Sequence, residues 1–212
     1  MRFLLLALLL PAAWAQPQFE IGGFIGYGFY RNATIYTAAG DATAGIRNRF
    51  AAGAVIGEDL YEHISGELRY TYQDGDPFVS AAGASGSVRG NENGGSHAFD
   101  YALLFHLKPR ASKLRPFFEV GAGAKYYRPN GPEPDPQPLP NIVTLTNQAD
   151  WRFLTTVGVG IKYRWKQHIL LRADFRDYIT PFPKRIFVQA QGGTDRGLFE
   201  QFTPSVGISY WF

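Results

Sequence analysis

The chain has 212 residues, with 21 Lys and Arg against 18 Asp and Glu, a formal net charge of +3, and no cysteine. No block of like charge stands out, so we expect no nucleic-acid partner. The lack of cysteine excludes disulfides as a source of stability. Glycine (24), phenylalanine (17) and tyrosine (12) are abundant, which is typical of strands whose two faces meet different environments.

The N-terminus has the pattern of an export signal. Arg2 gives a short positive region, residues 3–10 are apolar, and residues 13–15 have the small-x-small pattern of a cleavage site. The apolar run is too short for a membrane anchor, because a spanning helix needs about 18 or more apolar residues. We therefore expect 1–15 to be a signal peptide and 16–212 to be one domain of an exported protein.

Apolar and polar residues alternate in eight segments of the remaining chain. These segments are residues 19–30, 48–57, 63–73, 97–107, 116–128, 151–165, 169–178 and 201–212. In the clearest of them, Leu68 and Tyr70 share one face while Glu67, Arg69 and Thr71 share the other, as the two-residue period of a strand requires. The sequence therefore predicts eight strands, each with an apolar and a polar face.

The connections between these segments alternate in length. Long connections cover 31–47, 74–96, 129–150 and 179–200, and short ones cover 58–62, 108–115 and 166–168. Long loops at one end and tight turns at the other are the topology of outer-membrane barrels. We expect neither the small residues 81–95 nor the proline-rich run 129–140 to form a central strand, and we interpret the proline run as a stiff surface loop, with a docking motif as the alternative.

The polar face combines glycine with long charged side chains. An eight-stranded barrel has an interior that side chains just fill, so this mixture suits a packed polar lumen and an apolar, lipid-facing exterior. A soluble ligand-binding barrel, with its apolar face inward, is the competing interpretation. Glu20 lies on the polar face, and the predicted lumen charge network consists of Glu67, Arg69, Asp100, Glu119, Lys125, Lys162, Arg164, Arg172, Asp174 and Arg176.

The tight turn at 166–168 predicts a hairpin in which Lys162 and Arg172 lie opposite each other and share Asp174. Three further carboxylates are expected to face two cations from strands nearer the middle of the chain: Glu67, Glu119 and Asp100 opposite Arg69 and Lys125. We expect this network to plug the barrel.

Aromatic residues gather near the ends of the predicted strands, where amphipathic rings settle at membrane interfaces. The predicted outer girdle contains Tyr70, Tyr72, Tyr126, Trp151 and Phe153, and the predicted inner girdle contains Phe105, Tyr163, Trp165, Tyr210 and Phe212.

The end of the chain has the most specific motif. Ser205, Gly207, Tyr210 and Phe212 form the pattern polar-x-Gly-x-x-aromatic-x-aromatic, which ends on the terminal carboxylate. It resembles the C-terminal β-signal that the assembly machinery of outer-membrane barrels recognises. With the loop pattern, it makes the chain similar to the OmpA-like or OmpX-like family of small outer-membrane β-barrels. The resemblance implies an all-β, transmembrane, antiparallel up-and-down barrel of about eight strands in the bacterial outer membrane, with membrane lipids and the assembly machinery as partners.

Little in the sequence points to catalysis. His63, Ser65 and Glu67 alternate on one strand and could converge as base, nucleophile and orienting group, in faint resemblance to outer-membrane lipid A deacylases. They follow a turn on the periplasmic side and point into the lumen, whereas lipid A lies in the outer leaflet. We therefore expect no catalytic residue, and also no metal or cofactor, since the four histidines are scattered and thiolates are absent.

The favoured interpretation is a non-catalytic envelope protein, acting in envelope integrity or surface interaction, whose barrel supports four long extracellular loops that could bind an external ligand. A narrow, porin-like pore for ions or small solutes is the alternative, because lumen charges can line a channel as well as plug it. A lipid A-modifying enzyme is the third possibility.

Overall fold

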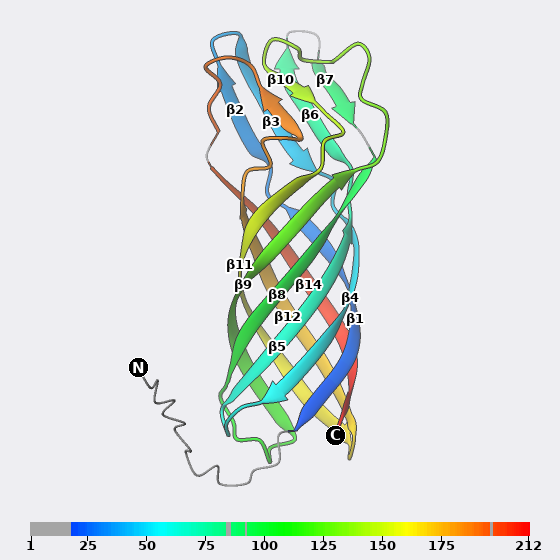
Figure 1. Cartoon of the computed structure of the whole chain (residues 1–212), viewed down its shortest axis with the longest axis vertical. Coiled ribbons are helices and arrows are strands. Elements are labelled where there is room, and N and C mark those ends of the chain that lie inside the picture. The colour runs from blue at the N-terminus through cyan, green and yellow to red at the C-terminus, as the bar shows by residue number, and fades with distance from the viewer. Residues whose placement is uncertain (1–17, 84–85, 92, 196) are drawn as a thin grey trace, which may run out of the picture.

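The computed structural model describes residues 18–83, 86–91, 93–195 and 197–212, and its regular elements are all strands. Eight of them close into a barrel in which each strand is antiparallel to the next in the chain and the last pairs with the first (Figure 1). The barrel strands are β1 (Phe19–Tyr30), β4 (Arg49–Asp59), β5 (Ile64–Asp74), β8 (Gly94–His106), β9 (Leu114–Pro129), β11 (Asp150–Lys166), β12 (Ile169–Pro181) and β14 (Leu198–Trp211). The predicted all-β, up-and-down, eight-stranded barrel is confirmed.

Each predicted segment is a barrel strand, and the differences lie at the strand ends. β8 begins at Gly94 and β12 extends to Pro181, beyond the predicted limits. The added residues pair with the ends of the neighbouring strands, Gly94 with Pro129 and Pro181 with Leu198. The predicted signal peptide lies outside the described residues. No helix in the described part of the chain is long and apolar enough to span a membrane.

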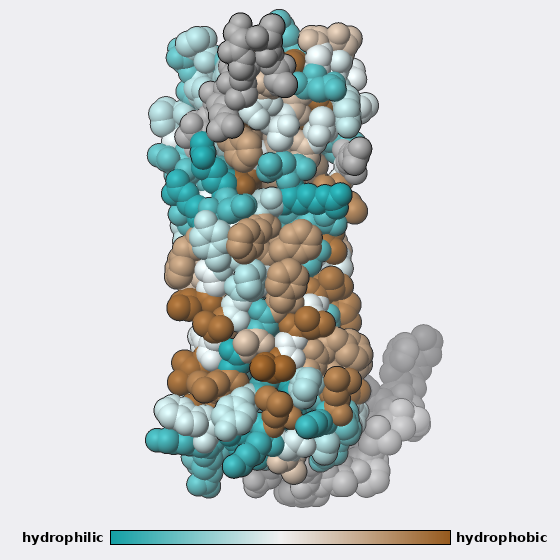
Figure 2. Space-filling view, turned by 180° about the vertical axis from the view of Figure 1, so that it is seen from behind, coloured by the Kyte–Doolittle hydropathy of each residue, from teal (hydrophilic) through white to brown (hydrophobic). Residues whose placement is uncertain are grey.

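The two faces of each barrel strand differ as the alternation predicts. In β5, Glu67, Arg69 and Thr71 are buried, whereas Leu68 between them is 52% exposed. In β11, Val159 is 57% exposed while Lys162 on the other face is buried. Figure 2 shows the result on one face of the barrel as an apolar band, bounded by hydrophilic side chains near both ends. Charged groups therefore lie inside the barrel and apolar groups cover it.

The long connections fold into a second body, the head, at one end of the barrel (Figure 1). Four strands from the first two long connections form a sheet in the order β2 (Ala33–Thr37), β3 (Gly40–Ile46), β6 (Pro77–Gly83) and β7 (Gly86–Asn91). β10 (Val143–Leu145) and β13 (Phe187–Gln189), from the other two, form a second sheet. Residues 81–95 were expected not to form a central strand, and most of them instead belong to the head hairpin of β6 and β7, whereas Gly94 and Gly95 begin the barrel strand β8.

The head has its own apolar core, which continues to the end of the barrel. The buried residues of this head core are Tyr30, Ala33, Ile35, Ala42, Ala44, Ile46, Val79, Tyr127, Ile142, Val143, Leu145, Phe182, Ile186, Phe187 and Phe199. Phe199 of β14 packs on Tyr30 and on Phe182, with ring centroids 5.4 and 6.0 Å away. All four long connections therefore share one core with the barrel rim.

The proline-rich run lies against the head without forming a strand. Gln137 donates through Nε2 to the carbonyl of Leu145 at 2.8 Å, and its Oε1 accepts from the Leu145 N–H at 3.1 Å. Glu133 likewise accepts from the Asn147 N–H at 3.0 Å. These bonds replace the sheet hydrogen bonds that proline cannot donate, so the run is fixed onto β10 through its few non-proline side chains.

Candidate functional site

The centre of the barrel contains a cluster of charged side chains, called here the lumen cluster. Its members are Glu20, Glu67, Arg69, Asp100, Glu119, Lys162, Arg172, Asp174 and Arg176. They come from β1, β5, β8, β9, β11 and β12 and are between 0% and 6% exposed. Eight of these nine residues belong to the predicted network, and the ninth, Glu20, was placed on the polar face but outside that network.

Glu67 of β5 is in contact with three guanidinium groups. Arg172 donates to it at 2.7 Å, Arg176 at 3.1 Å and Arg69 at 3.2 Å. β5 and β12 stand four strands apart in either direction around the barrel, so they form opposite walls. The pairs of Glu67 with Arg172 and Arg176 therefore bridge the full width of the lumen.

Asp174 of β12 makes the reciprocal bridge. Arg69 reaches it from the opposite wall at 2.9 Å, Arg172 donates to it at 3.0 Å, and Ser205 Oγ donates at 2.5 Å. The Arg69 guanidinium also lies over the ring of Phe24, 4.1 Å from the centroid. Both carboxylate oxygens thus have charged donors, the arrangement in which a buried ion pair is tolerated.

Arg176 holds the head side of the lumen cluster together. It donates twice to Glu119, at 2.7 and 2.5 Å, and once to Asp100 at 2.6 Å. Asp100 is the cross-strand partner of Arg69, as the expectation has it, but its hydrogen bond comes from Arg176. The expected pairing with Lys125 was wrong, because Lys125 lies toward the head and the fork of Arg176 lies between the two carboxylates.

Lys162 and Arg172 are direct cross-strand partners, which confirms the predicted hairpin register. They do not share Asp174, however. Lys162 pairs with Glu20 of β1 at 2.5 Å, and Asp174 is left to Arg172 and Arg69. The backbone register fixed which residues are neighbours, but the side chains extend across the lumen to a strand that is distant in sequence.

Two residues of the predicted network lie apart from the lumen cluster. Lys125 lies toward the head, where it donates to Gln201 and to Tyr30 Oη and packs on the ring of Tyr127 at 4.9 Å. Arg164 lies near the turn end of the barrel, 4.3 Å from the Trp211 ring centroid, and donates to the Arg110 carbonyl at 2.8 Å. The alternation along the strands predicts that Lys125 and Arg164 lie on the inward face, but it does not predict how far along the barrel they lie from the carboxylates of the lumen cluster.

Glycines make the room that the lumen cluster occupies. A Cβ at Gly158 would lie 2.5 Å from Glu119 Oε1, and one at Gly160 would lie 2.8 Å from the Cβ of Asp174. Real Cβ atoms do not approach so closely, so any larger residue on this stretch of β11 would displace the charged side chains.

The structure does not assemble the arrangement considered for catalysis. Ser65 Oγ donates to Asp59 at 2.6 Å and lies 2.8 Å from Nε2 of His106, while His63 bonds the His106 carbonyl. An activated serine needs the imidazole between serine and carboxylate, and here the serine lies between the other two. Within the described residues no group of three or more His, Asp or Glu side chains could hold a metal ion.

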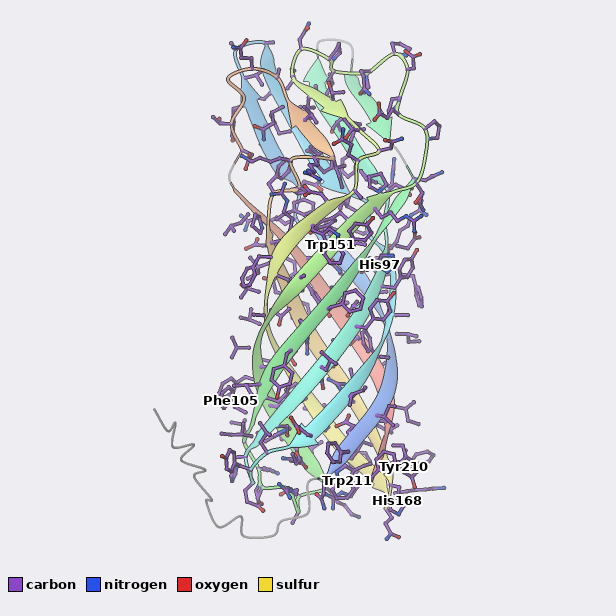
Figure 3. The ribbon with its side chains drawn as sticks, in the orientation of Figure 1. His97, Phe105, Trp151, His168, Tyr210 and Trp211 are labelled. Atoms are coloured by element: carbon purple, nitrogen blue, oxygen red, sulfur yellow. The ribbon has the colours of Figure 1, made fainter. Side chains whose placement is uncertain are left out.

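The C-terminal motif forms the strand that closes the barrel. Ser205 belongs to the Asp174 contacts above, and a Cβ at Gly207 would lie 2.6 Å from the Gly23 carbonyl and 2.9 Å from Arg172 Cγ. Tyr210 stacks on His168, with centroids 5.4 Å apart, and the Phe212 N–H donates to the Phe19 carbonyl. Figure 3 shows Tyr210, Trp211 and His168 together at the end opposite the head.

Solved structures with this fold come from the bacterial outer membrane. Neisserial surface protein A (NspA) superposes with a TM-score of 0.53 at 11% identity, over 91% of this chain and 96% of its own. OprG from Pseudomonas aeruginosa, titled an outer membrane protein, gives 0.54 at 14% identity over 92% and 95%. AlkL, an outer membrane protein solved in lipid bilayers, gives 0.50 at 15% identity over 91% and 90%. Neither a family model nor a curated protein matches the chain.

The molecule therefore has the fold of the small eight-stranded outer-membrane β-barrels. The resemblance to OmpA-like and OmpX-like barrels is confirmed at the level of this fold.

Proposed function

We propose that the chain is a non-catalytic, non-conducting barrel of the bacterial outer membrane, whose folded head recognises a partner outside the cell. The observation that carries the proposal is the head itself, in which four connections far apart in the sequence form two sheets around one apolar core. Loops held in one conformation on a rigid scaffold are the usual location of recognition sites. A barrel that served only as a pore would have no need of such a body.

The lumen cluster supports a closed barrel. Its ion pairs connect opposite walls, with Arg69 to Asp174 and Glu67 to Arg172 as the clearest bridges. A buried charge that loses its partner is expensive, so ions cannot pass without breaking several charge-assisted bonds at once. On the head side of this cluster the rings of Tyr30, Tyr127 and Phe199 add an apolar layer.

Two measurements test the proposal. Cells that display the chain should bind one member of a panel of extracellular glycans and matrix proteins, and cells displaying a variant with a disrupted head should not bind it. In a planar bilayer the protein should give little or no steady conductance. A reproducible channel would replace this proposal by the narrow pore, and a change in lipid A mass on expression would replace it by the lipid-modifying enzyme.

The proposed location has its own test. After membrane fractionation the protein should be found with the outer membrane and should migrate differently before and after boiling, as folded barrels do. Extraction without detergent would favour the soluble ligand-binding barrel. Removal of residues 1–15 on export is part of the same proposal, and the mass of the mature protein checks it.

A further inference from the structure

A cluster of polar-edged rings covers one side of the barrel next to the head. This aromatic patch consists of Tyr70, Tyr72, His97, Tyr126 and Trp151. Four of its members are direct neighbours across adjacent strands, since Tyr72 pairs with His97, His97 with Tyr126 and Tyr126 with Trp151. Figure 3 shows His97 and Trp151 close together at the head end of the barrel.

The rings of the aromatic patch are in contact and present polar atoms outward. Neighbouring ring centroids are 5.3 Å apart for Tyr72 and His97, 6.3 Å for His97 and Tyr126, and 4.7 Å for Tyr126 and Trp151. Tyr70 Oη lies 2.8 Å from His97 Nδ1, and a phenol that donates there leaves the imidazole proton on Nε2. Phenol, imidazole and indole donors thus share a surface on which Trp151 is 60% exposed.

A cation borders this surface on the head side. Arg128 is exposed and shares the outward face of β9 with Tyr126, one pleat further toward the head. Its cross-strand partner is Gly95, which has no side chain to cover the guanidinium. The guanidinium of Arg152, at the start of β11, is bonded to the buried carboxylate of Asp150, which also accepts from the backbone N–H of Arg185.

Another side of the barrel has the opposite charge at its outward positions. Asp177 of β12 and Glu200 of β14 lie on outward faces near the head. The cation beside them, Arg31, is bound to Glu200 at 2.7 Å. On β5, β8, β9 and β11 the outward groups near the head are the polar-edged rings, Arg128, and Asp74, whose carboxylate is bound to Arg49 at 3.2 Å. The outward carboxylates of β12 and β14 give the other side the more acidic surface.

We propose that Arg128 and the aromatic patch bind the phosphate headgroup of an anionic lipid in the outer leaflet. A guanidinium fork matches phosphate oxygens in pairs. Tyrosine, tryptophan and histidine at interface depth combine apolar contact with acyl chains and hydrogen bonds to headgroup oxygens. The carboxylates of β12 and β14 would repel such a lipid, so it binds on one side. This inference rests on the membrane location proposed above and adds a ligand class to it.

The test uses the purified protein in vesicles that contain brominated phosphatidylglycerol or brominated phosphatidylcholine with the same acyl chains. Bromine quenches tryptophan emission on contact, and the difference between the parent and Trp151→Phe isolates the emission of Trp151. We expect phosphatidylglycerol to be preferred at Trp151 by about fivefold, the effect of one basic residue near an anionic lipid surface. Arg128→Gln should abolish the preference, and Arg128→Lys should keep part of it because lysine lacks the bidentate fork.

Arg31→Gln is the matched control, because it removes the same charge from the surface near β14. It should leave the preference at Trp151 unchanged. Equal quenching by both lipids in the parent, or an equal loss in Arg31→Gln and Arg128→Gln, would overturn the inference. The shift in migration on boiling reports folding of each variant, so failure of the barrel to insert is distinguished from failure to select a lipid.

Discussion

The barrel interior and the head are built from opposite kinds of contact. In the lumen cluster the buried groups are charged, with Arg176 and Glu67 fully enclosed. In the head core they are apolar, with Ile35, Val143 and Phe187 fully enclosed. The two lie end to end in one chain of 212 residues (Figure 1). What a protein buries thus depends on what surrounds it.

The physical reason is the solvent on the outside of each part. In the proposed membrane location lipid accepts apolar side chains, so Leu68, Val159 and Ile208 can point outward and the narrow interior is filled by the polar positions that remain. In the same location water surrounds the head, and burial of apolar area then stabilises the head through the hydrophobic effect. Lys125 lies at the boundary, with neither a carboxylate partner within the described residues nor an apolar environment, but with tyrosine rings around it.

Removing the most connected cation should give the largest effect. Arg176→Met leaves Glu119 and Asp100 without their charged donor, and breaking a buried ion pair in this way costs about 3–5 kcal/mol. The free energy of unfolding, measured by urea titration in vesicles, should fall by that amount. The double variant Arg176→Met/Glu119→Gln should recover part of the loss, and equal stability of parent and single variant would show that the cluster contributes nothing.

Asp174→Ala removes a carboxylate from the same lumen cluster. It leaves Arg69 and Arg172 with one carboxylate fewer, and the loss of a buried partner again costs about 3–5 kcal/mol. The temperature at which the migration shift on boiling appears should fall clearly. If stability is unchanged and the parent conducts steadily, the lumen is a hydrated channel and the comparison with the head fails.

A cavity in the head should weaken the head and spare the barrel. Phe187→Ala removes a fully buried ring that packs on Phe182 at 5.3 Å, at a cost of about 3–5 kcal/mol. Proteolysis within the head should become faster while the barrel keeps its migration shift. Val188→Ala, at a neighbouring position that is 42% exposed, is the control and should behave as the parent. Loss of both head and barrel would show that the two bodies fold as one unit.

A charge on the lipid face tests the assignment of the faces. Val157 is 41% exposed in the middle of β11, and an arginine there should cost about 2–4 kcal/mol near the bilayer midplane. Urea titration in vesicles measures this cost, with Val157→Leu as the apolar control. Equal stability of Val157→Arg and the parent would mean that this face does not meet lipid.

The smallest effect on stability is expected at the C-terminus. Deleting Phe212 removes one backbone bond to Phe19 and an edge contact to Tyr210, at 5.0 Å between centroids. The purified barrel should therefore unfold almost as the parent does, whereas the amount assembled in cells should drop if Phe212 is read as an assembly signal. Gly207→Leu is a poorer test, because the added side chain would collide with the Gly23 carbonyl. Normal assembly without Phe212 would show that Phe212 is not needed as part of an assembly signal.

Alternation along the sequence determined the barrel. A strand has a side-chain period of two, so Glu67, Arg69 and Thr71 share a face whatever their partners are. Short turns then fix the register of hairpins, which is why Lys162 and Arg172 are paired as predicted. Both the strand period and the hairpin register depend on residues close together in the chain, so both can be predicted from a single sequence.

Tertiary structure alone decided the head and the ion pairs. The strands β10 and β13 have three residues each, too few for alternation to show, and they pair across more than forty positions of sequence. Arg69 and Asp174 are 105 residues apart and meet only because closure of the barrel puts β5 opposite β12. Which carboxylate a long side chain reaches across a lumen depends on that closure and on the room left by glycines, and neither is encoded in the period of any one strand.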